Sequence, residues 1–219
     1  MMMQHGIQAI IFDMDGVIAD SEPLHFEAEK TILQQRGIEA PWDEWHKFTG
    51  LTDDKIFQYL VDNFTDGRYS PEELMEAKYG IFITLLRDKL QLIPGVLEFI
   101  CWARDHYPKL ALTTSSTQRV QQTVFNKFEL NSYFDVIVTG DHIQHGKPHP
   151  EPYLTTVNAL DVPADACMVV EDSLSGVQSA KAAGCTVTGI TTSFLRQQLF
   201  EAGADFVIDD FASLYHDRE

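Results

Sequence analysis

The chain has 219 residues, of which 44% are hydrophobic, enough to bury the core of one large domain or of a domain plus a smaller one. Its 33 acidic and 16 basic side chains give a formal net charge of −17 at pH 7. This excess of negative charge argues strongly against nucleic acid or an anionic membrane as the main partner. An anionic substrate would need a local source of positive charge, from a metal ion or a placed lysine.

No apolar stretch approaches the roughly 20 residues that span a bilayer. The first residues also lack the basic and apolar regions of a signal peptide, so we expect a cytoplasmic protein with no membrane partner. Cys101, Cys167 and Cys185 are too far apart to suggest a metal knuckle or a disulfide framework. The last two fall in or beside predicted strands, which favours small buried apolar side chains.

The apolar run at residues 7–12 predicts a buried parallel strand. Asp13-Met14-Asp15-Gly16-Val17 follows it directly, so two carboxylates one residue apart stand at the carboxyl end of a strand. In open α/β sheets this is the end at which ligands bind. Such close carboxylates repel each other unless a cation or a proton lies between them. The plainer alternative is a turn that uses Asp as a turn residue.

The next seventy residues read as almost wholly helical, and none of them alternates as a strand would. One helix is expected after Ser21 and Pro23 and ends before Gly37. A second spans residues 53–64, with Thr52 as its cap, and a third starts at the capping box Ser70-Pro71-Glu72-Glu73 and runs to about residue 90.

Beyond residue 93, short β-rich runs alternate with helical segments, as they do in βαβ units. The predicted strands span residues 110–113, 136–139, 168–170, 186–190 and 206–208, and the predicted helices span residues 118–128, 152–160, 174–183 and 195–202. We therefore expect an α/β fold with a doubly wound parallel sheet built from residues 1–19 and 93–219. Residues 20–92 form a helical insertion, with hinges near Ala19 and Ile93-Pro94-Gly95.

Polar residues follow three more of the predicted strands. Thr114-Ser115-Ser116 comes after residues 110–113, Lys147 after residues 136–139, and Glu171-Asp172 after residues 168–170. Each has a plainer explanation alone: a helix cap, a solvated lysine, or acids at a helix start. Together with Asp13 and Asp15 they occupy four strand ends of one sheet, so they can face a single crevice.

The motifs and their order resemble the haloacid dehalogenase superfamily of phosphohydrolases, close to its β-phosphoglucomutase-like branch. The resemblance covers nearly the whole chain and rests on Asp13-Met14-Asp15-Gly16-Val17, Asp20-Ser21-Glu22-Pro23-Leu24-His25, Thr114, Gly146-Lys147-Pro148, Val170-Glu171-Asp172-Ser173, Gly176 and residues 180–184. It implies a Rossmann-like core and a small helical cap inserted after the first strand.

The resemblance also implies roles for these residues. Asp13 would be the nucleophile that forms an aspartyl phosphate, and Asp15 would protonate the leaving oxygen and then activate water. Lys147 and Thr114 would stabilise the transferring phosphoryl group. A Mg²⁺ ion would be held by Asp13, the backbone carbonyl of Asp15, and Asp172, with Glu171 in the same metal group. The substrate-binding residues would be Gly16, Ser115, Ser116 and His25.

The acid at Asp15 favours phosphate esters over the chemistry of haloacid dehalogenases and phosphonatases, which do not protonate an alkoxide in this way. We therefore predict a Mg²⁺-dependent phosphatase of small sugar or polyol monophosphates that acts as a monomer. A β-phosphoglucomutase-type mutase stays as the alternative, since His25 and residues 50–52 look like its cap elements. Against it, Asp53 and Thr117-Gln118 stand where such mutases carry Arg and Lys-Asn, although Lys55, Lys78 or Arg119 could compensate.

Two further features have plain explanations beside the functional ones. Trp42, Trp45 and Phe48 are most simply the core of a helical bundle. His25 is either part of that bundle or a partner that positions Asp15. A non-catalytic module on a degenerate core would have lost a catalytic group, and none is missing from this sequence.

Overall fold

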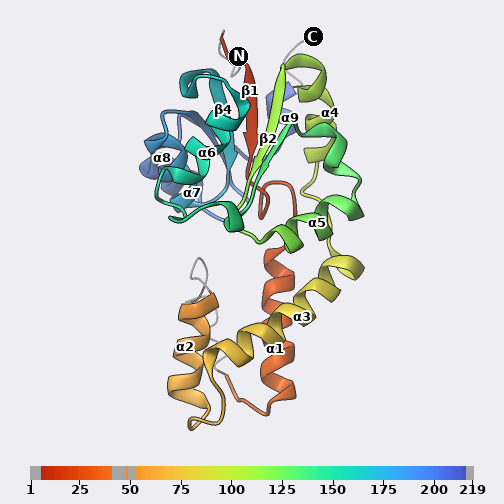
Figure 1. The fold of residues 1–219 in the computed structure, drawn as a ribbon, viewed down its shortest axis with the longest axis vertical. Helices are drawn as coiled ribbons and strands as arrows, with labels where there is room; N and C mark the ends of the chain where they lie inside the picture. The colour runs from red at the N-terminus through yellow and green to blue at the C-terminus, as the bar shows by residue number, and fades with distance from the viewer. Residues whose placement is uncertain (1–5, 41–47, 49–52, 216–219) are drawn as a thin grey trace. The chain divides into compact units, whose positions relative to one another are not determined.

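The computed structural model describes residues 6–40, 48 and 53–215. A six-stranded parallel sheet with the order β3-β2-β1-β4-β5-β6 forms its centre (Figure 1). The strands are β1 Ala9–Phe12, β2 Lys109–Thr113, β3 Val136–Val138, β4 Cys167–Glu171, β5 Thr186–Ile190 and β6 Phe206–Ile208. The doubly wound parallel fold is thus confirmed. The strand order reverses at β1, so β1 and β4 flank the switch point at which open α/β sheets bind ligands.

Helices cover both faces of this sheet, with α6, α7 and α8 on one side and α4 and α5 on the other (Figure 1). They are α4 Val96–His106, α5 Gln118–Lys127, α6 Glu151–Leu160, α7 Leu174–Ala182, α8 Arg196–Ala202 and the short α9 Ala212–Tyr215. The predicted segments differ from these bounds by one or two residues at most. Helix α4 was not predicted, although Val96, Phe99, Ile100 and Ala103 give it a buried stripe at helical spacing.

Alternate residues of β1 serve the two cores of the sheet. Ile11 belongs to the apolar cluster beneath α6 and α7. Phe12 points the other way, and its ring centroid lies 5.7 Å from that of Phe99 in α4 and 5.7 Å from that of Phe134. This period of two buries both faces of the strand and fixes the direction in which the following Asp13 leaves the sheet.

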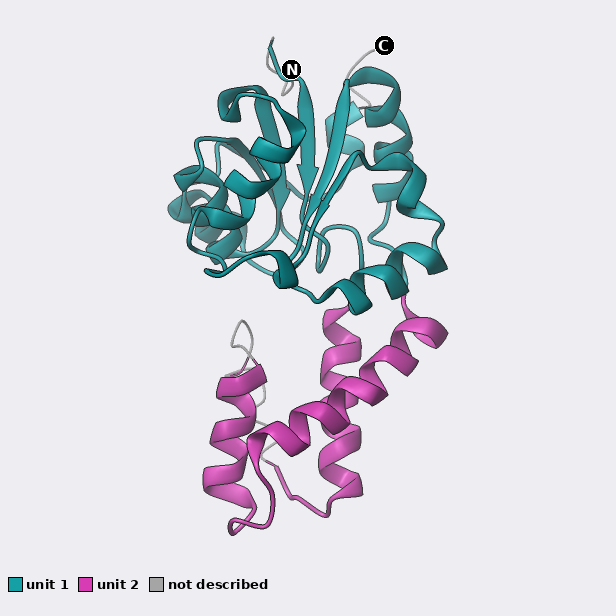
Figure 2. Cartoon of the chain, in the orientation of Figure 1, with its two compact units in different colours: residues 1–20, 91–219 teal, residues 21–90 magenta. Residues whose placement is uncertain are grey.

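The chain divides into two compact units, residues 1–20 with 91–219 and residues 21–90 (Figure 2). Within the first unit, the segments that leave and re-enter it pair with each other. The N–H of Asp20 donates to the carbonyl of Gln91 at 3.0 Å, and the N–H of Ile93 donates to the carbonyl of Ile18 at 2.9 Å. A short antiparallel bridge therefore closes the gap that the insertion opens in the chain.

The unit of residues 21–90 contains α1 Glu22–Gln35, α2 Asp53–Phe64 and α3 Pro71–Lys89. The capping box at Ser70 is present, with the Ser70 hydroxyl accepting from the N–H of Glu73 and the Glu73 carboxylate accepting from the N–H of Ser70. Phe48 is buried in this unit's apolar cluster, as its bundle interpretation predicts. Thr52, Trp42 and Trp45 lie outside the described residues. Among the described helices, none has the length together with the apolar character that crossing a bilayer demands.

The pairing of the strands brings together the strand ends that carry the candidate catalytic residues. Phe12 is paired with Leu112 of β2 and with Val170 of β4. The N–H of Asp13 donates to the carbonyl of Val170 at 3.0 Å, so the sheet continues one residue past β1. The residues that follow these three strands consequently emerge at the same edge, side by side.

Candidate active site

A buried ion set lies at the carboxyl edge of the sheet, around Lys147. Its ammonium lies 2.6 Å from Oδ1 of Asp13 and 2.5 Å from Oε1 of Glu171. All three side chains are nearly inaccessible to solvent. Lys147 is carried there by the loop after β3, across 134 residues of sequence from Asp13. The structure therefore brings together three of the residues that sequence analysis selected.

Glu171 is the most fully bonded member of the set. Its Oε1 accepts from Lys147 and from the Tyr153 hydroxyl at 2.8 Å, and its Oε2 accepts from the N–H groups of Asp172 and Ser173 and from the Ser173 hydroxyl, each at 3.0 Å. Both oxygens are thus occupied by protein donors. This arrangement suits an anchor that places Lys147 better than the metal ligand suggested by the sequence resemblance.

Tyr153 was not singled out from the sequence. It is fully buried at the start of α6, and the Lys147 ammonium lies 5.0 Å from its ring centroid. Its hydroxyl donates to Glu171 while its ring faces the cation, so it supports both charges. Nothing in its local pattern separates it from an ordinary core tyrosine.

Asp172 is held by the loop after β5. Its Oδ2 accepts from the hydroxyl of Ser193, and the Thr192 hydroxyl donates to the carbonyl of Gly16 at 2.6 Å. These two residues were also missed, although the signal existed: polar residues follow the predicted strand at 186–190, as they follow the other strand ends. They tie the β5 loop to both acidic loops of the site.

Burial, with repulsion between neighbouring carboxylates, raises the pKa values of two acids of this cluster. Ligand atoms of Asp13, Glu171 and Asp172 all lie within 4.8 Å of one another. Burial, reinforced by the neighbouring carboxylates, raises the pKa of Asp172 to about 7. Burial also raises the pKa of Asp13 well above its usual value, against the opposing effect of Lys147.

The pKa values of Glu171 and Lys147 both change in the direction that favours the charged form. Burial alone would raise the pKa of Glu171, but Lys147 and the hydrogen bonds hold it below its usual value. Burial alone would lower the pKa of Lys147, but Asp13 and Glu171 raise it, so the lysine stays charged. One ammonium thus neutralises part of the cluster, and Asp13 and Asp172 still favour a further cation. Hard oxygen ligands of this kind fit Mg²⁺.

Asp15 lies two residues beyond Asp13 and is oriented by the loop after β2. The Ser116 hydroxyl donates to Oδ2 of Asp15 at 2.8 Å. The Thr114 hydroxyl accepts from the N–H of Ser116 at 3.0 Å, which leaves its own hydrogen for another acceptor. Ser115 is exposed in the same turn. The structure therefore gives Ser116 a bond to the acid, beyond the substrate contact expected from the sequence.

Two glycines make room for the acids. Gly16 has φ +78°, and a Cβ there would collide with the Asp172 carboxylate. A Cβ on Gly176, in α7, would collide with the carboxylate of Glu171. Both positions therefore require glycine for close approach, and Gly16 requires it for its backbone as well.

In the unit of residues 21–90, His25 and Asp53 meet at a buried lysine. Lys78 is 1% exposed, and its ammonium lies 2.8 Å and 2.7 Å from the two Asp53 oxygens, 2.8 Å from Nδ1 of His25 and 3.5 Å from Glu29. The His25 ring also stacks on Phe82 at 3.9 Å. His25 and Asp53 are therefore joined through Lys78, and Asp53 is the partner of a buried cation.

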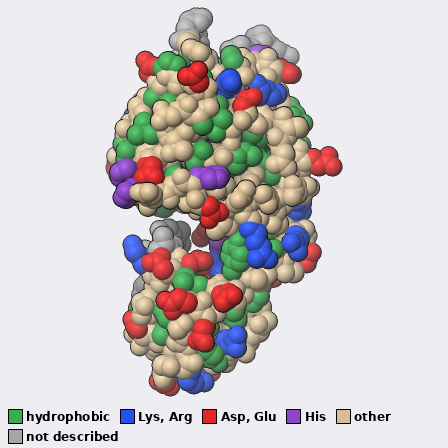
Figure 3. Space-filling model, in the orientation of Figure 1, with side chains coloured by type: hydrophobic (Ala, Val, Ile, Leu, Met, Phe, Trp, Pro, Cys, Tyr) green, Lys and Arg blue, Asp and Glu red, His purple; other side chains and the backbone are tan. Residues whose placement is uncertain are grey.

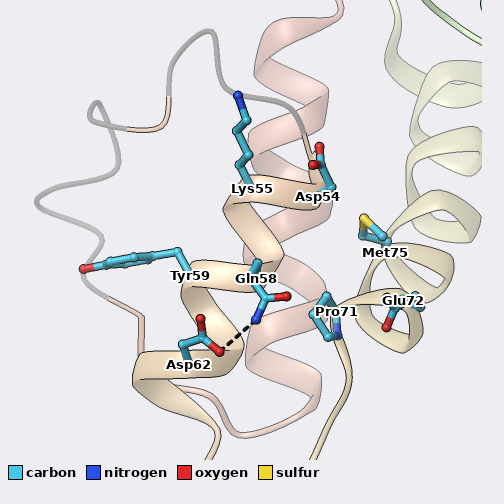
Figure 4. Close-up of a pocket in the computed structure, with 8 residues that line it drawn as sticks. All are labelled: Asp54, Lys55, Gln58, Tyr59, Asp62, Pro71, Glu72 and Met75. Carbon is cyan, nitrogen blue, oxygen red and sulfur yellow. Dashed lines mark hydrogen bonds between the residues drawn. The ribbon is translucent and has the colours of Figure 1, made fainter.

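An open pocket lies in the same unit, between α2 and the start of α3 (Figure 4). It is lined by Asp54, Lys55, Gln58, Tyr59, Asp62, Pro71, Glu72 and Met75. Its three carboxylates against one lysine make it unfavourable for a phosphate, and the residues that could transfer a phosphoryl group lie elsewhere.

Comparison with known proteins points to one family. Residues 10–190 match the family of haloacid dehalogenase-like hydrolases. The chain is 36% identical over 203 residues to a phosphorylated carbohydrates phosphatase of Thermotoga maritima, covering 90% of this chain and 92% of that protein. It is 30% identical over 178 residues to hexitol phosphatase B of Escherichia coli, covering 81% and 80% of the two chains.

A solved structure gives the same result for the fold. The crystal structure of CbbY from Rhodobacter sphaeroides in complex with phosphate superposes with a TM-score of 0.82. The two chains are 28% identical, and the match covers 95% of this chain and 96% of that one.

Proposed function

The chain belongs to the haloacid dehalogenase-like hydrolase family, and from that premise we propose that it is a Mg²⁺-dependent phosphatase of small sugar or polyol monophosphates. The observation that carries the proposal is the buried set at the sheet edge. A carboxylate, Asp13, is paired at 2.6 Å with the ammonium of Lys147, and a second acid, Asp15, stands two residues on. This is a nucleophile with a charge partner and a proton donor beside it.

In the proposed reaction an oxygen of Asp13 attacks the phosphorus of the ester. The bond from phosphorus to the leaving oxygen breaks, and Asp15 gives that oxygen a proton. Asp15 then takes a proton from a water molecule, which attacks the aspartyl phosphate and releases inorganic phosphate. The Ser116 hydroxyl at 2.8 Å keeps the carboxylate of Asp15 oriented through both steps. Lys147 and the Thr114 hydroxyl offset charge on the phosphoryl oxygens.

A bound Mg²⁺ would supply the positive charge that allows a carboxylate to approach a phosphate dianion. Asp13, Asp172 and the backbone carbonyl of Asp15 are the groups we assign to it. We assign Glu171 a positioning role, because its side chain is fully buried and its two oxygens already accept five hydrogen bonds, from Lys147, Tyr153, Ser173 and two backbone N–H groups. Ser193 would keep Asp172 turned toward the same ion.

The names of the similar proteins support a substrate class for this chain. Because the similar proteins from Thermotoga maritima and Escherichia coli are named for phosphorylated carbohydrates and for hexitol phosphates, we propose neutral polyhydroxy leaving groups. We propose that the helical insertion, predicted from the sequence to span residues 20–92, selects among these leaving groups. The phosphoryl site is shared by all phosphate esters and cannot discriminate among them.

A panel of phosphate esters tests this function. We expect phosphate release from hexitol and sugar monophosphates in the presence of Mg²⁺, loss of turnover with excess chelator, and recovery when Mg²⁺ is restored. Full turnover in excess chelator would overturn the metal assignment. A folded protein that releases phosphate from none of the esters would overturn the phosphatase.

A β-phosphoglucomutase-type mutase remains the alternative function, and the Asp53–Lys78 pair speaks against it. A mutase must bind a second phosphate that is not being transferred. Here the Lys78 ammonium is already paired with Asp53 at 2.7 Å and with Glu29 at 3.5 Å, so such a phosphate would have to compete with two carboxylates. β-Glucose 1-phosphate with a bisphosphate activator separates the two: a phosphatase releases inorganic phosphate, and a mutase forms glucose 6-phosphate.

Asp53→Arg is expected to destabilise the protein. From the sequence alone, an arginine at this position would be expected to help bind a second anionic group. In the structure it would instead face the buried Lys78 ammonium and remove its bidentate partner. We expect a loss of about 1–3 kcal/mol in the free energy of unfolding and lower rates for all esters. Asp54→Arg, an exposed neighbour on the same helix, is the control for the charge change in denaturant unfolding. A lower KM for bisphosphates with unchanged stability would contradict this expectation.

A further inference from the structure

A second group of metal-binding side chains lies outside the carboxylate cluster, in the loop that carries Lys147. Donor atoms of His145, His149 and Glu151 all lie within 4.8 Å of one another. Nδ1 of His145 is 2.7 Å and Nδ1 of His149 is 3.9 Å from the same carboxylate oxygen of Glu151. Histidine side chains are visible at the surface of this unit (Figure 3), and those of His145 and His149 are 63% and 52% exposed.

The backbone holds this group in place before any ion binds. The N–H groups of Gln144 and His145 donate to the Glu151 carboxylate at 2.6 Å and 3.0 Å, which closes the loop on itself. The Glu151 side chain is 26% exposed, so, unlike the fully buried Glu171, it can also bind an ion from the solvent side. The Ser179 hydroxyl of α7 donates to the carbonyl of His149 at 2.6 Å. Pro148 and Pro150 restrict the backbone on either side of His149. The three donors therefore converge through the loop's own structure.

The donor set differs in kind from that of the catalytic cluster. Imidazole nitrogen suits Zn²⁺, Cu²⁺ and Ni²⁺, whereas a set made only of carboxylate and carbonyl oxygens suits Mg²⁺. We propose that His145, His149 and Glu151 form a second metal site, selective for Zn²⁺ and similar transition ions, on the Lys147 loop. Three protein ligands leave a fourth tetrahedral position for water or another ligand.

The geometry requires only a small contraction. Ligands of a tetrahedral Zn²⁺ lie about 3.4 Å apart, given metal–ligand distances of about 2.0–2.1 Å. The exposed imidazole rings can turn about their side-chain bonds to reach this spacing, and Nδ1 of His149 then gives up the hydrogen bond that it accepts from the N–H of Glu151 at 3.2 Å. Glu151 is the first residue of α6, so the positive helix end opposes a cation, and we expect micromolar rather than nanomolar affinity.

The ordinary alternative is a solvated loop in which His145 and Glu151 form a surface ion pair. Zinc titration of the full-length, untagged protein by calorimetry, at saturating Mg²⁺, separates the two. We expect wild type to bind Zn²⁺ with micromolar affinity, and His145→Ala and His149→Ala each to weaken it by about tenfold or more. His106→Ala, another exposed histidine of the same unit, is the matched control and should bind as wild type does.

Co²⁺ gives a second measurement, because tetrahedral coordination produces intense visible absorption that both histidine variants should lose. Thermal unfolding without metal checks that the variants fold. The proposal is overturned if wild type binds no Zn²⁺ at tens of micromolar, or if the histidine variants bind it as wild type does. It is also overturned if Asp172→Asn, rather than the histidine variants, removes Zn²⁺ binding. The test does not depend on phosphatase activity.

Discussion

Asp13→Asn is expected to remove detectable turnover of every phosphate ester, with kcat/KM lower by at least about four orders of magnitude. The amide has no anionic oxygen to attack phosphorus, so no aspartyl phosphate forms. The substitution keeps the size of the side chain, which is buried beside Lys147 at 2.6 Å. Steady-state kinetics with p-nitrophenyl phosphate and a hexitol phosphate measure the loss, and thermal unfolding checks the fold. Near wild-type rates would show that the nucleophile is misassigned.

Asp15→Asn is the matched control for this prediction, because it changes the same functional group two residues away. With a good leaving group such as p-nitrophenolate, protonation is not needed, so the first half-reaction should continue. The water then lacks its base, and we expect turnover to fall by about 10²–10⁴-fold. Rapid quenching should therefore trap a phosphorylated protein in Asp15→Asn and none in Asp13→Asn. Trapping it in neither variant would contradict the assignment of the two acids.

Lys147→Met is expected to abolish activity and also to destabilise the fold. The ammonium lies 2.6 Å from Asp13 and 2.5 Å from Glu171, and both carboxylates are buried. Removing one partner of a buried ion set leaves uncompensated charge and costs about 3–5 kcal/mol in the free energy of unfolding. Denaturant unfolding measures this cost. Lys181→Met is the control, since its pair with Asp205 at 2.8 Å is partly exposed and should contribute about 1 kcal/mol or less.

The destabilisation of Lys147→Met should depend on pH. In wild type, Lys147 opposes the rise in the pKa of Asp13 and holds the pKa of Glu171 down. Without it, both folded-state pKa values rise above their unfolded values, so the folded variant takes up protons more readily than the unfolded chain. The difference in the free energy of unfolding between wild type and Lys147→Met should therefore become smaller as the pH is lowered from 8 toward 5. If Lys147→Met lost no more free energy of unfolding than Lys181→Met at every pH, the argument from buried charge would be contradicted.

Local sequence patterns were sufficient for the order of the strands and of most helices, and for the acids at the strand ends. Strands such as β5 Thr186–Ile190 are short runs rich in β-branched residues, and the capping box at Ser70 is complete within four residues. The placement of Asp13, Lys147 and Asp172 at one sheet edge follows from parallel pairing, because all carboxyl ends of such a sheet share an edge. Helix α4 was not predicted, because its apolar stripe follows directly on Pro94 and Gly95, which favour a turn.

What only the tertiary structure decided is which groups the site residues bond to. Tyr153 meets Glu171 across 18 residues, Ser193 meets Asp172 across 21, and Lys78 meets Asp53 across 25. These contacts decide that Glu171 is anchored at both oxygens and that Asp53 neutralises a buried lysine. A periodic pattern indicates which face of a helix or strand is buried, and therefore from which face each side chain projects. The partner that it finds depends on the path of loops from distant parts of the chain, and local periodicity carries no information on that path.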